Sequence, residues 1–168
     1  MYASNMKGSV RMDLGKSVAE RAEMLEKTPL SKEFSWRELE ELSKYMNVQK
    51  FPKDIVIFEE GDKKEFLCVI FQGKVNILKG VGNEKKLITS IGAGKIFGEM
   101  SLIDGSPRSA TAIACEDTVL IVLTQREFNK ILDEKPRMGA KILQKIATIM
   151  SYRLRETTGV LADYLGKY

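Results

Sequence analysis

Short runs of strand-forming residues, separated by turn signals, fill the chain from Phe51 to Leu123 and constrain its fold more than any other feature. β-Branched and aromatic residues dominate the runs, and the turn sequences EGD, QG, GVGN and GAG interrupt them. Many short strands at this spacing are typical of a β-sandwich or a jelly roll. The sequence therefore predicts a mainly β fold, a jelly-roll-like β-roll, from the runs IVIF, FLCVIF, VNIL, LITSI, SATAIAC and TVLIVL.

Helices are predicted on either side of this roll, which makes the fold class α+β. Ser35 and Glu38 form a capping box at the start of one helix, and Thr124 and Glu127 form a second. The inner faces of these helices carry Leu39, Leu42 and Met46 in the first case, and Phe128, Ile131 and Leu132 in the second.

The sequence DEKP separates the second helix from a long final helix, which begins near Pro136 because proline interrupts the helical hydrogen bonds. Residues before Pro29 are polar with loose apolar spacing, which indicates a mobile arm or a short helix. We therefore predict an N-terminal arm or helix over 1–33, the β-roll with its flanking helices over 34–135, and a C-terminal helix over 136–168.

The chain contains no histidine among its 168 residues. Histidine-based acid and base chemistry, Ser-His-Asp nucleophiles and the commonest zinc and iron sites are therefore excluded. Jelly-roll oxygenases are excluded for the same reason, because histidines typically hold their metal. We expect a protein that is not an enzyme and that carries neither a metal nor a cofactor.

The patterns of charged and apolar residues restrict the cellular location of the protein and the partners that it can bind. The net charge is +4, but the 27 basic residues are interleaved with the 23 acidic ones, which argues against a nucleic-acid surface. Cys68 and Cys115 lie in apolar runs without paired spacing, so we expect buried thiols in a reducing compartment. The apolar runs are shorter than the roughly 18 residues of a membrane span. A cytoplasmic protein without a membrane segment is predicted.

The stretch FGEMSLIDGSPRSATA, residues 97–112, interrupts the roll between two predicted strands. Gly98 lets a ligand approach the backbone, and a helical turn closed by Gly105 would present free amides to an anion. The guanidinium of Arg108 can grip two phosphate oxygens, and the carboxylate of Glu99 can accept a hydrogen bond from a hydroxyl. A phosphorylated ribose supplies both groups. The simpler alternative is a surface salt bridge between Glu99 and Arg108.

A second candidate phosphate-binding motif is GAGK, residues 92–95. It resembles the end of a triphosphate-binding loop, but Ile96 stands where the motif requires Ser or Thr, and no opening glycine has the right spacing. A dinucleotide-binding turn is excluded as well, because no long helix follows.

The 97–112 stretch resembles the phosphate-binding cassette of the cyclic nucleotide-binding domain family through FGE, the glycine turn and PRSA, in that order and spacing. The resemblance extends upstream through FEEGD (58–62) and QGKV (72–75), and downstream through RLRETT (153–158). It covers residues 34–161, which is most of the chain.

This resemblance implies roles for individual residues. Glu99 would accept from the ribose 2′-hydroxyl, Arg108 would neutralise the cyclic phosphate, Ile88 would contact the base, and Thr157 or Thr158 would cap the base. The full set of implied ligand-binding residues is Ile88, Phe97, Gly98, Glu99, Met100, Ser101, Arg108, Ser109, Ala110, Thr157 and Thr158.

The resemblance also implies a regulatory sensor in which ligand binding moves the C-terminal helix. We expect cyclic AMP rather than cyclic GMP, because Ser109 stands where guanine-preferring members tend to have threonine. Cyclic GMP stays open, since a serine hydroxyl can also serve guanine. The alternative function is a degenerate roll kept as a protein-interaction scaffold.

The final helix carries an apolar stripe at steps of three and four residues, which must be covered. We expect a homodimer through this helix, with packing inside the monomer as the alternative. No helix-turn-helix follows in the chain, so direct DNA binding is not expected, and the effector protein is unknown. The stripe consists of Leu143, Ile146, Met150, Leu154, Leu161 and Tyr164, with Thr157 as its uncharged polar member.

Overall fold

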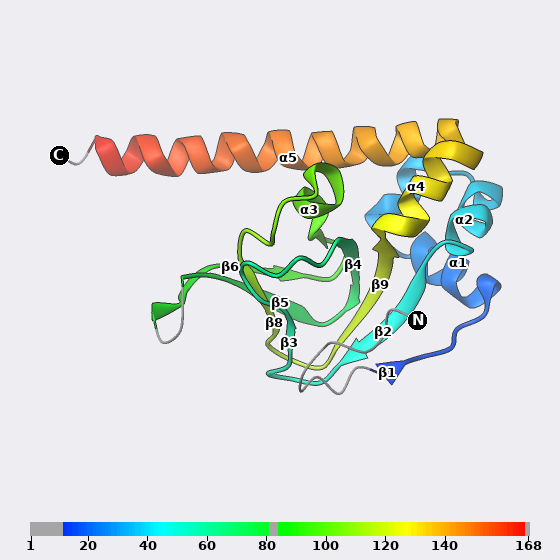
Figure 1. The fold of residues 1–168 in the computed structure, drawn as a ribbon, viewed down its shortest axis with the longest axis horizontal. Helices are drawn as coiled ribbons and strands as arrows, with labels where there is room; N and C mark the ends of the chain where they lie inside the picture. The colour runs from blue at the N-terminus through cyan, green and yellow to red at the C-terminus, as the bar shows by residue number, and fades with distance from the viewer. Residues whose placement is uncertain (1–11, 81–83, 167–168) are drawn as a thin grey trace. The chain divides into compact units, whose positions relative to one another are not determined.

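The computed structural model describes residues 12–80 and 84–166. The chain divides into two compact units, and the boundary lies between Asn129 and Lys130. The first unit contains the strands and the N-terminal helices, while the second contains the end of α4 and all of α5 (Figure 1).

Two antiparallel sheets form the roll of the first unit. The first sheet has the strand order β1-β2-β9-β4-β7, and the second has the order β3-β8-β5-β6. The predicted mainly β fold with flanking helices is confirmed, and all six predicted runs contain strands. The strands are β1 (Met12–Asp13), β2 (Asn47–Phe51), β3 (Val56–Phe58), β4 (Phe66–Gln72), β5 (Lys74–Lys79), β6 (Lys86–Gly92), β7 (Ile96–Phe97), β8 (Thr111–Ala114) and β9 (Thr118–Thr124).

Three of these strands, β1, β2 and β7, were not among the predicted runs. β2 mixes polar and apolar residues, and it is a strand because five of its residues pair with β9, from Asn47 opposite Val122 to Phe51 opposite Thr118. β1 and β7 have only two residues each, which is too short for a periodic pattern to appear.

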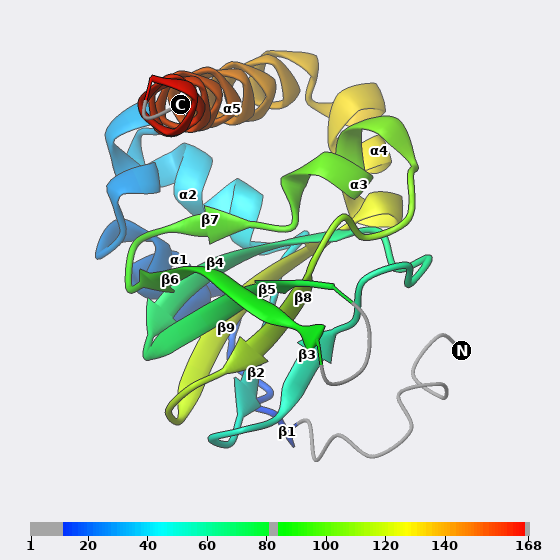
Figure 2. The same ribbon diagram turned by 90° about the vertical axis from the view of Figure 1, so that its left-hand side faces the viewer.

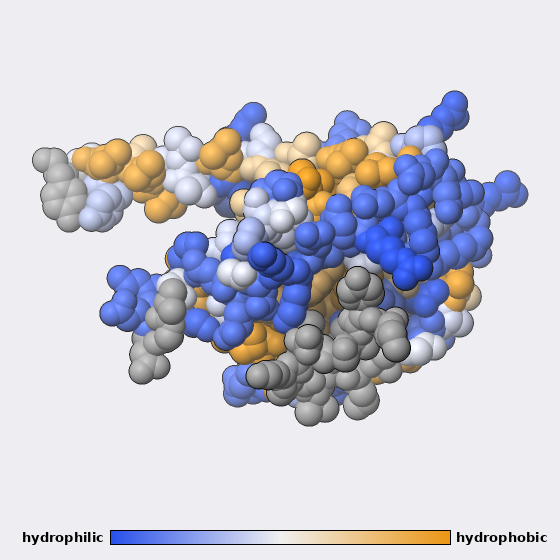
Figure 3. Space-filling view, in the orientation of Figure 1, coloured by the Kyte–Doolittle hydropathy of each residue, from blue (hydrophilic) through white to orange (hydrophobic). Residues whose placement is uncertain are grey.

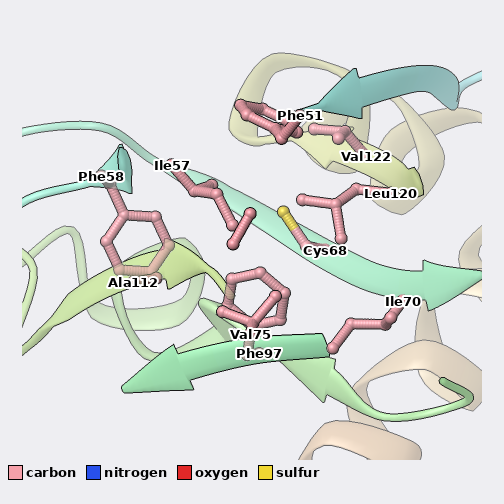
Figure 4. Packing of buried hydrophobic residues seen from close by; sticks show 11 residues of the cluster. Phe51, Ile57, Phe58, Cys68, Ile70, Val75, Phe97, Ala112, Leu120 and Val122 are labelled. Carbon is pink, nitrogen blue, oxygen red and sulfur yellow. The ribbon is translucent and has the colours of Figure 1, made fainter. Parts of the chain in front are cut away.

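Apolar side chains from both sheets fill the space between them (Figure 4). Phe51 and Leu120 come from the first sheet, while Ile57 and Val75 come from the second. Cys68 is completely buried in this cluster, as predicted. The prediction for Cys115 was wrong: its side chain is partly exposed, because it lies just beyond the end of β8, where its thiol donates to the Lys74 carbonyl at 3.3 Å.

Three short helices lie between β1 and β2: α1 (Val18–Glu26), the 3₁₀ helix η1 (Pro29–Glu33) and α2 (Trp36–Ser43). The predicted capping box of Ser35 and Glu38 begins α2, and Leu39 and Leu42 are buried on this helix, as expected. Met46 is buried too, but it lies beyond the end of α2 at Ser43 and not on the helix as predicted. A second capping box, formed by Ser17 and Glu20, begins α1 and was not predicted.

The predicted break at DEKP is confirmed. Helix α4 (Gln125–Glu134) ends there, Lys135 has non-helical backbone angles, and α5 (Pro136–Leu165) begins with the proline. A Cβ on Gly139 would lie 2.7 Å from Cδ2 of Leu132, so the two helices approach closely just after the break. At the start of α4, the Thr124 hydroxyl accepts from the Glu127 amide at 3.3 Å, as the capping prediction required.

Candidate anion-binding site

The predicted insertion connects the first sheet to the second. β7 leads into helix α3 (Glu99–Asp104), and the chain then returns to β8 (Figure 2). Gly105 adopts a left-handed conformation with φ 66° and closes α3, as predicted. Glu99 is the first residue of α3 and follows directly after Gly98, which caps the helix.

Gly98 brings the backbone against the side chain of Arg108. Its φ is 78°, in the left-handed region that glycine occupies without strain. A Cβ at this position would lie 2.8 Å from the Phe66 carbonyl oxygen and 2.9 Å from Nη1 of Arg108. Glycine is therefore required here both by the backbone angle and by the close approach.

The guanidinium of Arg108 is buried beneath this glycine, and its side chain is only 4% exposed. Nη1 donates to the Gly98 carbonyl and Nη2 to the Phe66 carbonyl, both at 2.8 Å. Its Nε is buried without a hydrogen-bond partner, and in the described part of the chain Arg108 forms no salt bridge. Burial lowers the pKa of Arg108, although nearby acidic groups oppose that shift.

A buried cation without a direct ion pair is unusual, because transferring a charge out of water is costly unless it is compensated. The alternative of a surface salt bridge between Glu99 and Arg108 is wrong, since both side chains are buried, at 1% and 4% exposure. The guanidinium instead donates to two backbone carbonyls and lies near several acidic groups.

The FEEGD turn holds the backbone of Arg108 on both sides. The Arg108 amide donates to the Asp62 carbonyl, and the Gly61 amide donates to the Arg108 carbonyl, each at 2.8 Å. The Glu60 amide also donates to the hydroxyl of Thr111 at 3.0 Å. The backbone of Arg108 is therefore fixed before any ligand binds.

Ser109 is held by a lysine from the neighbouring strand. Nζ of Lys79 lies 2.6 Å from the Ser109 carbonyl and 2.6 Å from Oε1 of Glu60. The hydrogen bond from Lys79, followed by that from the Gly80 amide, lowers the pKa of the Glu60 carboxyl. The Ser109 hydroxyl donates to the sulfur of Met100 at 3.8 Å, which joins the two ends of the insertion.

The structure brings most of the predicted site residues together in the first unit. Phe97 and Ser101 are buried and Met100 is half exposed, and Ala110 follows Ser109 on the return to β8. Ile88 lies on β6 of the second sheet with 62% of its surface exposed. Thr157 and Thr158 belong to the second unit, where their hydroxyls donate to the carbonyls of Arg153 and Leu154 at 2.8 Å.

Three further residues at the site were not predicted: Phe58, Phe66 and Lys79. The rings of the two phenylalanines lie 4.1 and 4.4 Å from Cζ of Arg108. FEEGD and FLCVIF both stand out in the sequence, but only the folded chain shows that their first residues meet Arg108.

Two antiparallel sheets form a roll with a short helical insertion over a buried arginine, which is a jelly-roll architecture. Residues 48–135 match the model of the cyclic nucleotide-binding domain. The chain belongs to the cyclic nucleotide-binding domain family, as the sequence predicted.

Individual relatives are similar over much of the chain. The cyclic AMP receptor protein of Thermus thermophilus is 32% identical over 67% of this chain and 50% of its own length. The cAMP-dependent protein kinase regulatory subunit of Candida albicans is 38% identical over 51% of this chain and 18% of its own. The crystal structure of a cyclic nucleotide-binding domain from Methylobacillus flagellatus superposes with a TM-score of 0.76, at 35% identity over 87% of this chain and 84% of that one.

The chain thus spans half the length of its bacterial relative and a smaller part of the kinase subunit. Within the described residues, no helix has the length and apolar character needed to cross a bilayer. The same residues contain no cluster of three or more side chains suited to holding a metal ion.

Proposed function

We propose that this chain is a regulatory module that binds cyclic AMP through the 97–112 insertion. The observation that carries the proposal is the buried guanidinium of Arg108, which forms no salt bridge within the described residues. A cyclic phosphate would supply the missing negative charge. The relatives support this choice, because one is named a cyclic AMP receptor protein and another a cAMP-dependent kinase regulatory subunit.

The remaining contacts of the ligand follow from the chemistry of the insertion. The buried carboxylate of Glu99 would accept a hydrogen bond from the ribose 2′-hydroxyl, and charged acceptors form stronger hydrogen bonds than neutral ones. Ser109, with its backbone held by Lys79, would offer its amide and hydroxyl to the phosphate. The exposed side chain of Ile88 would pack against the base and become partly buried.

A preference for adenine over guanine is part of the proposal. The hydroxyl protons of Thr157 and Thr158 are already donated to backbone carbonyls of their own helix. A hydroxyl that has given its single proton can still accept, so it suits the adenine amino group. Guanine presents a carbonyl at this position, and a threonine could donate to it only by giving up its helical hydrogen bond.

We further propose that ligand binding is coupled to α5 through the break at Lys135. The side chain of α4 residue Leu132 packs against Gly139, so a movement of α4 would be transmitted across the break. A ligand can shift such an equilibrium only by its difference in affinity for the two states. A cytoplasmic, non-catalytic sensor that forms a dimer through α5 completes the proposal.

Thermal unfolding with cyclic AMP, cyclic GMP and 5′-AMP tests this function. A ligand at about 100 times its dissociation constant should stabilise the protein by roughly 2.7 kcal/mol. Arg108→Leu should remain folded and lose the shift, and Glu99→Ala should lose about 1.5–3 kcal/mol of binding free energy. A wild type that no cyclic nucleotide stabilises would favour the scaffold function instead.

A further inference from the structure

Two aromatic rings surround the buried guanidinium of Arg108 where a counter-ion would be expected. Cζ of Arg108 lies 4.1 Å from the centroid of the Phe58 ring and 4.4 Å from that of the Phe66 ring. The two rings meet edge to face, at 5.9 Å between centroids and 70° between planes. Phe58 is 5% exposed, and its ring points into the core between the sheets (Figure 4).

Aromatic faces carry partial negative charge, so they attract a cation, and the attraction grows when water is excluded. The rings therefore compensate part of the cost of burying Arg108. The two carbonyl acceptors, of Gly98 and Phe66, and the nearby acidic groups contribute further compensation. The guanidinium is thus stabilised in its observed position without any ligand.

The backbone of Arg108 is held as firmly as its side chain. Its backbone amide and carbonyl are both bound to the FEEGD turn, at 2.8 Å each. The same turn provides Phe58 as its first residue, so one segment fixes both the backbone and one face of the guanidinium. FEEGD therefore holds Arg108 at its backbone and at its guanidinium, although none of its residues is expected to contact the ligand.

We propose that Phe58 and Phe66 form an aromatic clamp that stabilises Arg108 in the ligand-free state and thereby weakens binding of the anion. The affinity of a ligand reports the difference between the bound and the free states. The clamp acts on the full positive charge of the free state. A bound phosphate brings negative charge toward the ring faces, which are themselves partly negative, so the rings favour the bound state less.

The clamp itself can be tested without a ligand, by urea unfolding of the single variants Phe58→Leu, Phe66→Leu and Arg108→Leu. The two double variants combine Arg108→Leu with Phe58→Leu or with Phe66→Leu. We expect the effects of Phe58→Leu and Arg108→Leu not to be additive. The double variant should depart from the product of the two single effects on the unfolding equilibrium constant by about two- to thirty-fold. The control is Phe51→Leu, because Phe51 lies in the same core and, among the described residues, its ring forms no cation–π contact with Arg108. Additive effects of Phe58→Leu and Arg108→Leu would overturn the clamp.

The effect on binding rests on the proposed function and is measured by calorimetric titration with cyclic AMP. Phe58→Leu and Phe66→Leu should bind about two- to thirty-fold more tightly than the wild type, whereas Phe51→Leu should bind equally. Unchanged or weaker binding in both clamp variants would refute the proposal. If a leucine variant fails to fold, 3,4,5-trifluorophenylalanine at position 58 keeps the shape, weakens the negative ring face and should also tighten binding.

The two proposals can fail separately. If the wild type binds neither cyclic AMP nor cyclic GMP, the proposed function is wrong, and the coupling between Phe58 and Arg108 in unfolding then decides the clamp by itself. If the wild type binds and the leucine variants do not bind more tightly, the function stands and the clamp is rejected.

Discussion

Gly98 and Arg108 are fitted to one another in two ways. Nη1 of Arg108 donates to the Gly98 carbonyl at 2.8 Å, and the same nitrogen lies 2.9 Å from the point where a Cβ on Gly98 would stand. The backbone at Gly98, near the start of the insertion, thus packs closely against the side chain of Arg108, ten positions later. A change at either residue must affect the other.

Replacing Gly98 with alanine should destabilise the protein and weaken ligand binding. The left-handed backbone angle alone costs about 1–3 kcal/mol for a residue with a Cβ. The new methyl group would also collide with the Phe66 carbonyl oxygen, which as backbone cannot turn aside. Urea unfolding and cyclic AMP titration measure the two effects.

Gly92→Ala is the matched control, because a Cβ there would meet nothing within 4 Å. It should leave both quantities close to those of the wild type. Equal stability of the two alanine variants would contradict the tight packing at Gly98.

Threonine hydroxyls on α5 should contribute to the choice of base. Thr157→Ala or Thr158→Ala should reduce the preference for cyclic AMP over cyclic GMP by about one neutral hydrogen bond, roughly 0.5–1.5 kcal/mol. Competition titration of the two nucleotides measures the ratio in each variant. Thr148→Ala is the control, since this threonine makes the same backbone bond on the same helix. A wild type that prefers cyclic GMP would refute the assignment.

The hydrogen bond that Lys79 donates to the Glu60 carboxylate should make a pH-dependent contribution to the free energy of unfolding. The pKa of the Glu60 carboxyl is lowered from 4.5, first by the hydrogen bond from Lys79 and then by that from the Gly80 amide. A depressed carboxyl pKa contributes stability above the unfolded value, and this contribution is lost as the pH falls through the folded value. Glu60→Gln should therefore be less stable than the wild type at pH 6.

The difference between Glu60→Gln and the wild type should shrink steadily as the pH is lowered below 4.5, which thermal unfolding across that range can follow. Glu26→Gln, at the end of α1, serves as the control for a general charge effect. A difference that stays constant with pH would show that the carboxylate charge is not responsible.

Several apolar side chains along α5 are exposed (Figure 3), and Leu154, for example, is 68% exposed. We expect Met150→Glu with Leu154→Glu to convert a dimer into a monomer in light scattering, because charges would be buried at the interface. Tyr152→Glu is the control, since residues two positions away face elsewhere on a helix. A wild type that is already monomeric at micromolar concentration would contradict the dimer.

Much of the fold could be predicted because its signals are local. Short runs of strand-forming residues between turn signals predicted the strands, and the spacing from Ser35 to Glu38 predicted the start of α2. The cassette was recognisable for a similar reason: Gly98, Gly105 and Arg108 lie within one continuous stretch, where spacing along the chain restricts spacing in the structure.

By itself, then, the sequence determined the β-roll, the break before Pro136 and the presence of an arginine, a carboxylate and two glycines in one insertion. The tertiary structure decided what surrounds them. Phe66 is 42 positions from Arg108, and the strand pairing of β4 with β7 and the turn at FEEGD bring both phenylalanines to it. Long-range packing of this kind depends on how the sheets close, and no local pattern encodes it, so the aromatic surroundings of Arg108 emerged only from the folded chain.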